Sequence, residues 1–387
     1  MSGVLIHDGR RIGHRKWCVD AINAGAADGV VLNPFATPRV AEPRHPSASD
    51  VAQAVRDVGG EVILDPMTHA LFLPGTNRVD FYDAWKLWGP AGQSLDGQAQ
   101  QLAHVERVFD RQSQIGAPHL APTLQLQTPQ SADAYQAIEI ARVAKGLDSS
   151  CGQSLVGTRS FWSSGAHLDA YVGSLASLRA PVWVITVANE MVVDHVPDLS
   201  NTAAFAGRCR TVHSLSLRSR VILAYADFSG LPAVAAGADT VGSGWDRAQR
   251  TFDPLAFRVD SDPGIRIPAS YVTQGGLNSV LRRDTAEAIE RRDSARALKI
   301  RGGPMPPSDQ AQRMHHLRQL RSAVHQLEAA GDRQARVDTL RDRYRTASAE
   351  FDRLISDLPR IVRESDKAAW ASSPANALEA YAGSEGL

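Results

Sequence analysis

Short apolar runs alternate with helical patterns along most of this sequence, and that alternation constrains the fold more than any other feature. An apolar run followed by a helix is one βα unit, and consecutive units recur roughly every 30 residues. We identify eight runs, at residues 29–32, 61–64, 119–127, 153–158, 182–187, 221–224, 240–241 and 265–272. Eight units predict an α/β fold of the (β/α)8 TIM-like barrel type, with a doubly wound open sheet as the alternative.

The composition limits the class of protein. Lys and Arg balance Asp and Glu at 42 each, and 43% of the residues are apolar, which indicates neither disorder nor a generally basic surface. Three widely spaced cysteines, Cys18, Cys151 and Cys209, fit neither a disulfide framework nor a zinc site. No apolar run approaches the roughly 20 residues that span a bilayer. We therefore expect a cytoplasmic protein with no metal, no cofactor and no membrane association.

The pattern of the sequence changes beyond residue 305. Leu317, Leu320, Val324 and Leu327 recur at intervals of three and four, and a second stripe with the same spacing begins at Val337. Two such stripes predict two helices that pair as an antiparallel coiled-coil hairpin.

We expect three parts in the chain: a barrel over residues 1–305, a helical hairpin over 306–370 and a flexible tail over 371–387. The hairpin carries nearly as many acidic as basic residues, which favours a solvated surface over a nucleic-acid patch. It could cover the barrel, pair with a second copy of the chain, or bind a protein partner.

Polar residues at the strand ends are the first candidates for function, because barrel enzymes hold their active sites at the carboxyl ends of the strands. The candidate catalytic residues are Asp65, Glu190 and Asp227. A buried carboxylate is costly unless it is paired or used, but Asp65 precedes a proline, and capping that turn is an equal expectation. Further candidates for substrate binding are Asn33, Gln125, Arg159, Asn189 and Tyr225.

A small-residue segment, Gly242-Ser243-Gly244, follows the run at 240–241, with Trp245 and Arg247 close behind. The backbone N–H groups of such a segment can approach a phosphate, and many barrels bind one at this position. Arg247 would suit the same anion. We therefore predict that these five residues contribute to substrate binding.

Two other patterns are weaker. The pair Asn189-Glu190 is typical of retaining glycosidases built on barrels, but such enzymes need a second carboxylate about 5 Å away. The next glutamate is Glu287, inside a predicted helix, so Glu190 is left as a ligand-binding or structural acid. Asp65 and His69 could both ligate a metal, yet two ligands do not make a site.

Three segments carry a resemblance to a known family: VILDPMTH, DFYDAWKLW and GADTVGSGWDRAQR. They resemble the tRNA-guanine transglycosylase superfamily, whose barrels exchange a nucleobase in RNA or, in some members, in DNA. The resemblance spans most of residues 28–275 and implies that Asp65 lies near the base. Gly242 stands where the family has its nucleophilic aspartate, and the zinc-binding cysteines of the family have no counterpart here.

The first hypothesis is therefore a transglycosylase-like barrel enzyme that acts on a nucleobase, nucleoside or nucleic acid, with tRNA or DNA as its partner. Asp65 and Asp227 would be its acid/base or nucleophilic carboxylates. Trp162, Tyr225 and Trp245 would stack on an extruded base. Two alternatives remain: a catalytically silent barrel that binds nucleic acid or protein through the hairpin, and a barrel enzyme that acts on a phosphorylated metabolite.

Overall fold

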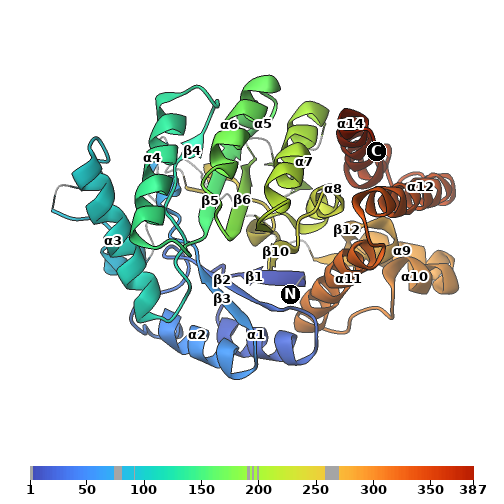
Figure 1. The fold of residues 1–387 in the computed structure, drawn as a ribbon. Coiled ribbons are helices and arrows are strands. Elements are labelled where there is room, and N and C mark those ends of the chain that lie inside the picture. Colours follow the sequence, from blue (N-terminus) through green and yellow to red (C-terminus); the bar gives the residue numbers. More distant parts are fainter. Residues whose placement is uncertain are drawn as a thin grey trace.

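A curled sheet of eight parallel strands, ordered β3-β2-β1-β10-β9-β6-β5-β4, forms the centre of the molecule. The structure is a computed structural model that describes residues 3–73, 81–90, 92–189, 192–193, 196–197, 200–257 and 270–387. Helices surround the sheet on its outer face (Figure 1). The chain therefore has an α/β fold of TIM-like type, in agreement with the alternation of apolar runs.

The strands are short and apolar, as strands covered on both faces are. Those of the sheet are β1 Gly3–His7, β2 Gly29–Leu32, β3 Glu61–Leu64, β4 Gln125–Leu126, β5 Gln153–Thr158, β6 Val182–Ala188, β9 Arg220–Ala224 and β10 Thr240–Gly244. The helices around them are α1 His14–Asn23, α2 Ala48–Asp57, α3 Gln98–Gln114, α4 Ala132–Leu147, α5 Arg159–Trp162, α6 Ala166–Ala176, α7 Thr202–Ser216 and α8 Leu231–Ala235. Two short strands, β7 Val192–Val193 and β8 Val196–Pro197, pair with each other outside the sheet.

The two ends of the sheet are β3 and β4, and a side chain of α3 links β3 to Leu120, in the segment before β4. Gln112 of α3 donates from Nε2 to the carbonyl oxygens of Leu64 and Leu120, each at 3.0 Å, and its Oε1 accepts from the N–H of Leu120 at 3.1 Å. Its amide group therefore makes hydrogen bonds at this junction that a neighbouring strand would otherwise make.

Two expectations about the strands are corrected. The first strand along the chain is β1, which is not among the eight predicted runs, although all five of its residues are buried. The run at 265–272 supplies no strand of the sheet in the described part. Residues 265–269 lie outside the described residues, and Tyr271–Gln274 (β11) pairs antiparallel with Ser279–Arg282 (β12).

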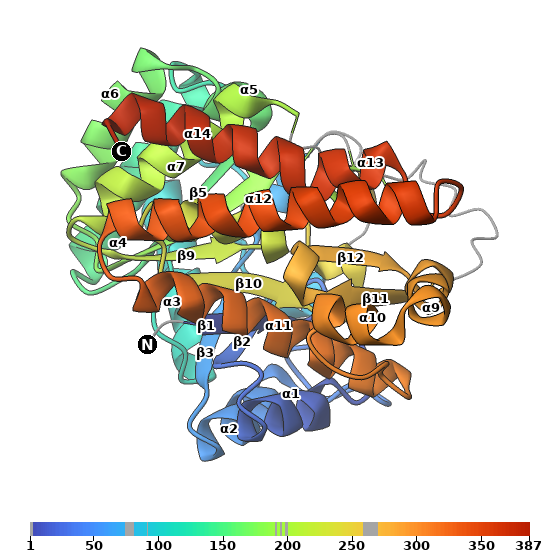
Figure 2. The same cartoon turned by 90° about the vertical axis from the view of Figure 1, so that its right-hand side faces the viewer.

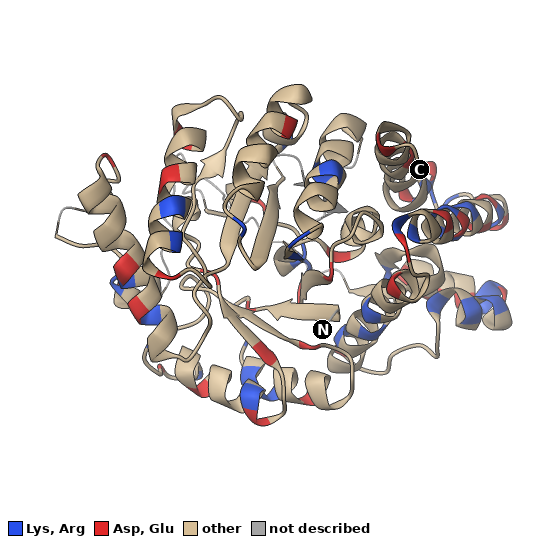
Figure 3. Cartoon of the chain, in the orientation of Figure 1, with Lys and Arg blue, Asp and Glu red and all other residues tan. Residues whose placement is uncertain are grey.

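The C-terminal stripes do form helices, α11 Asp309–Ala329 and α12 Arg333–Asp357, after α9 Arg283–Arg292 and α10 Ser294–Arg301. Helix α11 packs on β1, β10 and α8, so it covers the sheet over two adjacent inner strands (Figure 2). A coiled-coil hairpin is not confirmed, because the apolar residues of both helices join the core of the barrel. Acidic and basic residues are interspersed along α12 (Figure 3).

The expected flexible tail is instead largely helical. After the short helix α13 Glu364–Lys367, α14 Ser373–Glu385 packs on α7 and buries Leu378 and Tyr381. The phenol of Tyr381 lies 2.9 Å from Nδ1 of His213. Ala377, Leu378, Tyr381 and Ala382 fall on one helical face, and that spacing is typical of a helix packed on a core.

Ion pairs close the amino ends of the strands. Arg220 of β9 binds both carboxylate oxygens of Glu61 of β3, at 2.6 and 2.8 Å, and Arg321 of α11 binds Asp28 at 2.8 Å. Polar groups free for function are therefore expected at the opposite, carboxyl ends. No helix among the described residues combines the length and apolar character that a membrane span requires.

Candidate functional site

Aromatic side chains fill much of the described barrel mouth at the carboxyl ends of the strands. Tyr225, just after β9, stacks on His7 at the end of β1, with ring centroids 3.8 Å apart and an interplanar angle of 21°. Phe252 packs against Tyr225 at 5.7 Å and against Phe257 at 5.8 Å, and Phe35 joins Phe257 at 5.1 Å. A substrate would have to enter beside this cluster.

His7 accounts for the glycine at position 242. A Cβ atom added to Gly242 would lie 2.2 Å from Nε2 of His7, so the imidazole occupies the space that a side chain there would need. The backbone N–H of Tyr225 donates to the same Nε2 at 3.0 Å, which leaves the ring proton on Nδ1. Burial lowers the pKa of His7 to about 3, so the ring is neutral at pH 7. Its Nδ1 has no hydrogen-bond partner in the described part of the chain.

Asp65 follows β3 and is almost wholly buried. Its Oδ1 accepts from the N–H of Met67 at 2.9 Å, so the carboxyl group does cap its own turn. Burial raises the pKa of Asp65 to about 6, and the Met67 bond opposes that rise. A carboxyl group with this pKa can both hold and release a proton near neutral pH. Asp65 therefore caps its own turn and can also act as an acid or a base.

The same turn carries His69, the second polar residue after β3. It is buried, burial lowers its pKa to about 3, and its Nε2 has no hydrogen-bond partner among the described residues. Its ring packs edge-on against Phe252, with centroids 5.3 Å apart. The described residues contain no group of three or more His, Cys, Asp or Glu side chains placed to hold a metal ion.

A cavity of about 340 Å³ opens beside this turn, near the β3 and β4 ends of the sheet. His69 lines it together with Gln125 of β4, whose Oε1 is buried without a partner. The other lining residues are mostly polar: Phe72, Leu73, Gln93, Ser94, Leu95, Asp96, Leu124, Gln127, Asp133 and Gln136. Its volume is within the range of small-molecule sites.

Asp227 lies in a different environment, at the junction with α11. Its Oδ1 is 3.2 Å from Nε2 of His316, whose Nδ1 lies 2.8 Å from the hydroxyl of Thr273 and 3.3 Å from Nη1 of Arg250. Burial raises the pKa of Asp227, but His316 and Arg250 outweigh it, so the net pKa is lowered. Asp227 is therefore an ionised carboxylate already paired inside the molecule. Its catalytic role stays a prediction.

The segment after β10 makes internal contacts. The hydroxyl of Ser243 lies 3.1 Å from Nε2 of His316, and the indole of Trp245 donates to Nδ1 of His14 at 3.0 Å. A Cβ on Gly244 would meet Cβ of Gln249 at 2.3 Å, and the guanidinium of Arg247 lies 3.9 Å from the ring centre of Tyr271. These contacts account for the Gly-Ser-Gly pattern without a phosphate, whose binding there stays a prediction.

The remaining predicted site residues fall into separate places. Asn33 organises its own loop, because its Oδ1 accepts from the N–H groups of Phe35 and Ala36 at 3.1 and 3.0 Å. Arg159 begins the short helix α5 and is half-buried. Glu190 lies outside the described residues.

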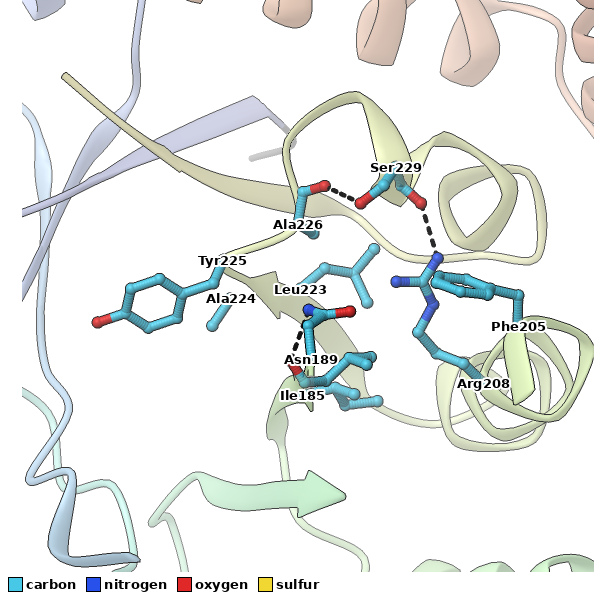
Figure 4. A pocket seen from close by; sticks show the side chains of 10 residues that line it. Ile185, Asn189, Phe205, Arg208, Leu223, Ala224, Tyr225, Ala226 and Ser229 are labelled. Atoms are coloured by element: carbon cyan, nitrogen blue, oxygen red, sulfur yellow. Dashed lines mark hydrogen bonds between the residues drawn. The ribbon is translucent and has the colours of Figure 1, made fainter. Parts of the chain in front are cut away.

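Asn189 lines a second, smaller cavity of about 10 Å³, which has room for about one water molecule. Arg208 reaches this cavity from α7 and donates to the carbonyl oxygen of Ser229 at 2.7 Å, whereas the ring of Tyr225 points away from it (Figure 4). Tyr225 therefore contributes to the aromatic cluster and has only its backbone end in this cavity.

The structure thus brings Asp65, Gln125 and Tyr225 to the barrel mouth and separates them from Asp227 and Ser243. Sequence reasoning missed His7 because β1 was not recognised as a strand. With β1 assigned, the rule that functional groups follow strands would have found His7. His316 had no such signal, because its partners lie far away in the sequence.

Comparisons with known proteins add little to this description. No family model matches the chain, and no curated protein resembles it in sequence. Among solved structures, the catalytic domain of the hyperthermophilic chitinase from Pyrococcus furiosus is 11% identical, with 63% of this chain and 83% of that chain covered and a TM-score of 0.36. A probable tagatose 6 phosphate kinase from Sinorhizobium meliloti 1021 is 13% identical, with 100% and 98% covered and a TM-score of 0.29. Similarities of this size carry no argument about activity.

Proposed function

We propose that this chain is a barrel enzyme that cleaves or transfers a glycosidic bond, with Asp65 as the group that transfers the proton. The observation that carries the proposal is the buried position of Asp65 after β3, with its pKa raised to about 6. Among the described carboxyl groups, Asp65 is the one whose pKa is raised. Asp65 can protonate a leaving group and then, as a carboxylate, accept a proton from the attacking nucleophile.

The neighbours of Asp65 suit this role. His7 and His69, which follow or end strands at the same end of the sheet, are neutral, since burial lowers the pKa of each, so neither adds a positive charge to that end. A cation there would lower the pKa of Asp65 and weaken it as an acid. The resemblance to the transglycosylases places the corresponding Asp near a nucleobase, and a nucleobase, nucleoside or nucleic acid is the substrate that it implies.

Turnover by the Asp65→Asn variant tests the proposal. We would measure hydrolysis of alkyl glycosides, whose leaving groups must be protonated, and release of base from nucleosides between pH 4 and 8. The wild-type rate should fall as the pH rises through about 6, and the variant should lose roughly 10²- to 10⁴-fold in kcat/KM together with that pH dependence. Unchanged turnover by a folded Asp65→Asn protein would remove Asp65 from the chemistry.

A second candidate, a catalytically silent barrel that binds a partner, is favoured by the aromatic packing in the mouth. Tyr225 lies between His7 and Phe252, and Asp227 is engaged by His316. If this reading holds, no glycoside is turned over and labelled tRNA or DNA binds with an affinity that falls steeply with salt. Turnover that depends on Asp65 would exclude it.

A further inference from the structure

We infer that the 340 Å³ cavity between the ends of the sheet binds the uncharged, hydroxyl-bearing ring of a sugar, and that it selects against phosphorylated forms. The inference deepens the proposed function. The statement that the bound sugar is part of the substrate rests on that function. Binding itself is measured without turnover, so it can be judged on its own.

Two unpartnered polar atoms point to a ligand. Nε2 of His69, a side chain only 3% exposed, and Oε1 of Gln125 are both buried without a hydrogen-bond partner among the described residues. Leaving such groups unsatisfied carries a free-energy penalty. Both residues line the same cavity, and rotation of their side chains toward a bound ligand would give both atoms partners and recover that free energy.

The chemistry of the lining indicates which ligand. Amide side chains such as Gln125, Gln127 and Gln136 both donate and accept hydrogen bonds, as hydroxyl groups do. Asp133 is acceptor-only when ionised, so it needs a donor from the ligand. Phe72 adds an apolar face against which a ring can lie. A ring that carries several hydroxyl groups matches this set of partners.

The charges of the described cavity lining disfavour a phosphorylated ligand. The described lining contains two carboxylates, Asp96 and Asp133, and no Lys or Arg. A phosphate placed there would face like charges and would lack the guanidinium or ammonium partners that phosphate sites use. The cavity therefore does not support the expectation of a phosphorylated metabolite as substrate.

The position of the cavity connects it to the chemistry. His69 lies on the same turn as Asp65, whose pKa burial raises, so a sugar bound against His69 would lie near the proposed acid. An unphosphorylated saccharide and the ribose of a nucleoside share the chemistry described, and the experiment is designed to separate these two sources.

Saturation-transfer NMR with matched probe pairs tests the inference: glucose against glucose 6-phosphate, and adenosine against adenosine monophosphate. We expect the sugar protons of glucose or adenosine to receive saturation, and the phosphorylated partner of that pair to bind roughly tenfold more weakly. A response from glucose alone identifies a saccharide site, and a response from adenosine alone identifies a nucleoside site. No response from either, or tighter binding of the phosphorylated forms, would overturn the inference.

Variants assign the binding to this cavity. Gln125→Ala and Asp133→Asn should each weaken binding roughly tenfold, the equivalent of one lost hydrogen bond to a charged or buried group. Asp133 is exposed, so its variant is expected to fold, and circular dichroism would verify both. The matched control is Gln53→Ala, an exposed glutamine on α2, which should bind as wild type does. Undiminished binding in both cavity variants would place the sugar elsewhere.

The outcomes separate this inference from the proposed function. Sugar binding that Asp65→Asn retains, in a protein with no turnover of any glycoside, would leave the cavity assigned and the proposed function rejected. Glycoside turnover that depends on Asp65 but is unaffected by Gln125→Ala and Asp133→Asn would support the proposed function and reject the assignment of the cavity.

Discussion

At the scale of single residues, the buried carboxyl group of Asp65 couples the proposed chemistry to stability. Its pKa is raised to about 6 in the folded chain, from the ordinary value of 3.8. The folded state therefore holds the proton more tightly than the unfolded state does. The contribution of this group to stability is fully present below about pH 4 and is lost as the pH rises through about 6.

Replacing Asp65 by Asn should therefore stabilise the protein at neutral pH. The amide keeps an oxygen for the N–H of Met67 and removes the cost of burying a charge. We expect the free energy of unfolding at pH 7.5 to rise by up to about 3 kcal/mol, with the difference from wild type disappearing near pH 4. Urea unfolding at both pH values measures it. Asp57→Asn, at an exposed position of α2, is the control, and a difference that does not depend on pH would contradict the assignment.

A second residue-scale prediction concerns His7 and Gly242. Gly242→Ala should cost about 1 to 3 kcal/mol of stability, because the new methyl group would meet the imidazole of His7 at 2.2 Å. The same substitution made in a His7→Ala background should cost much less, since the closest remaining atom is the carbonyl oxygen of Leu223 at 3.1 Å. Denaturant unfolding of the four proteins in this cycle measures the coupling free energy. Equal costs in the two backgrounds would show that His7 is not what excludes a side chain there.

At the scale of elements, the side chain of Gln112 in α3 makes specific hydrogen bonds to the backbone at one end of the sheet. Gln112→Ala removes three hydrogen bonds to buried backbone groups of Leu64 and Leu120. We expect a loss of about 2 to 4 kcal/mol and faster hydrogen exchange at the amide of Leu120. The control is Gln114→Ala, an exposed glutamine on the same helix, which should change stability by less than about 0.5 kcal/mol. Unchanged exchange at Leu120 would contradict the bridging role.

The strands also show which elements can be predicted from the sequence and why others cannot. Gln153–Thr158 (β5) was predicted with its exact bounds, and Val182–Ala188 (β6) within one residue, because their apolar pattern is local. β1 was not predicted as a strand of the sheet, and the run that contains β11 was. Short apolar runs look alike in sequence, and only their distant partners decide that β1 joins the sheet and β11 does not.

The candidate site divides in the same way. Asp65 and Gln125 were found because a rule about strand ends applies to each residue separately. The pairing of Asp227 with His316 could not be found, since it depends on how α11 packs against the barrel. The structure gives the two carboxyl groups opposite pKa shifts, and a shared role for Asp65 and Asp227 stays a prediction.

At the scale of the whole molecule, the C-terminal helices are part of the barrel's own core. Leu317, Leu320 and Val324 of α11 are fully buried in one cluster with the strands, and Asp246 after β10 binds Arg313 of α11 at 2.6 Å. The predicted boundary at residue 305 therefore runs through a continuous packed region. A chain cut there would expose the outer face of β1 and β10 to water.

Two truncations test this whole-molecule prediction. A chain of residues 1–305 should lose its cooperative thermal transition and near-ultraviolet circular dichroism, and it should associate in solution, because a large apolar surface is uncovered. A chain of residues 1–372 lacks only α14, which buries Leu378 and Tyr381 against α7, and it should stay folded with a lower melting temperature. The second chain controls for truncation as such. If residues 1–305 unfold cooperatively as a monomer with native circular dichroism, the barrel is complete without α11, and the helices that follow are an independent part, as the sequence alone predicts.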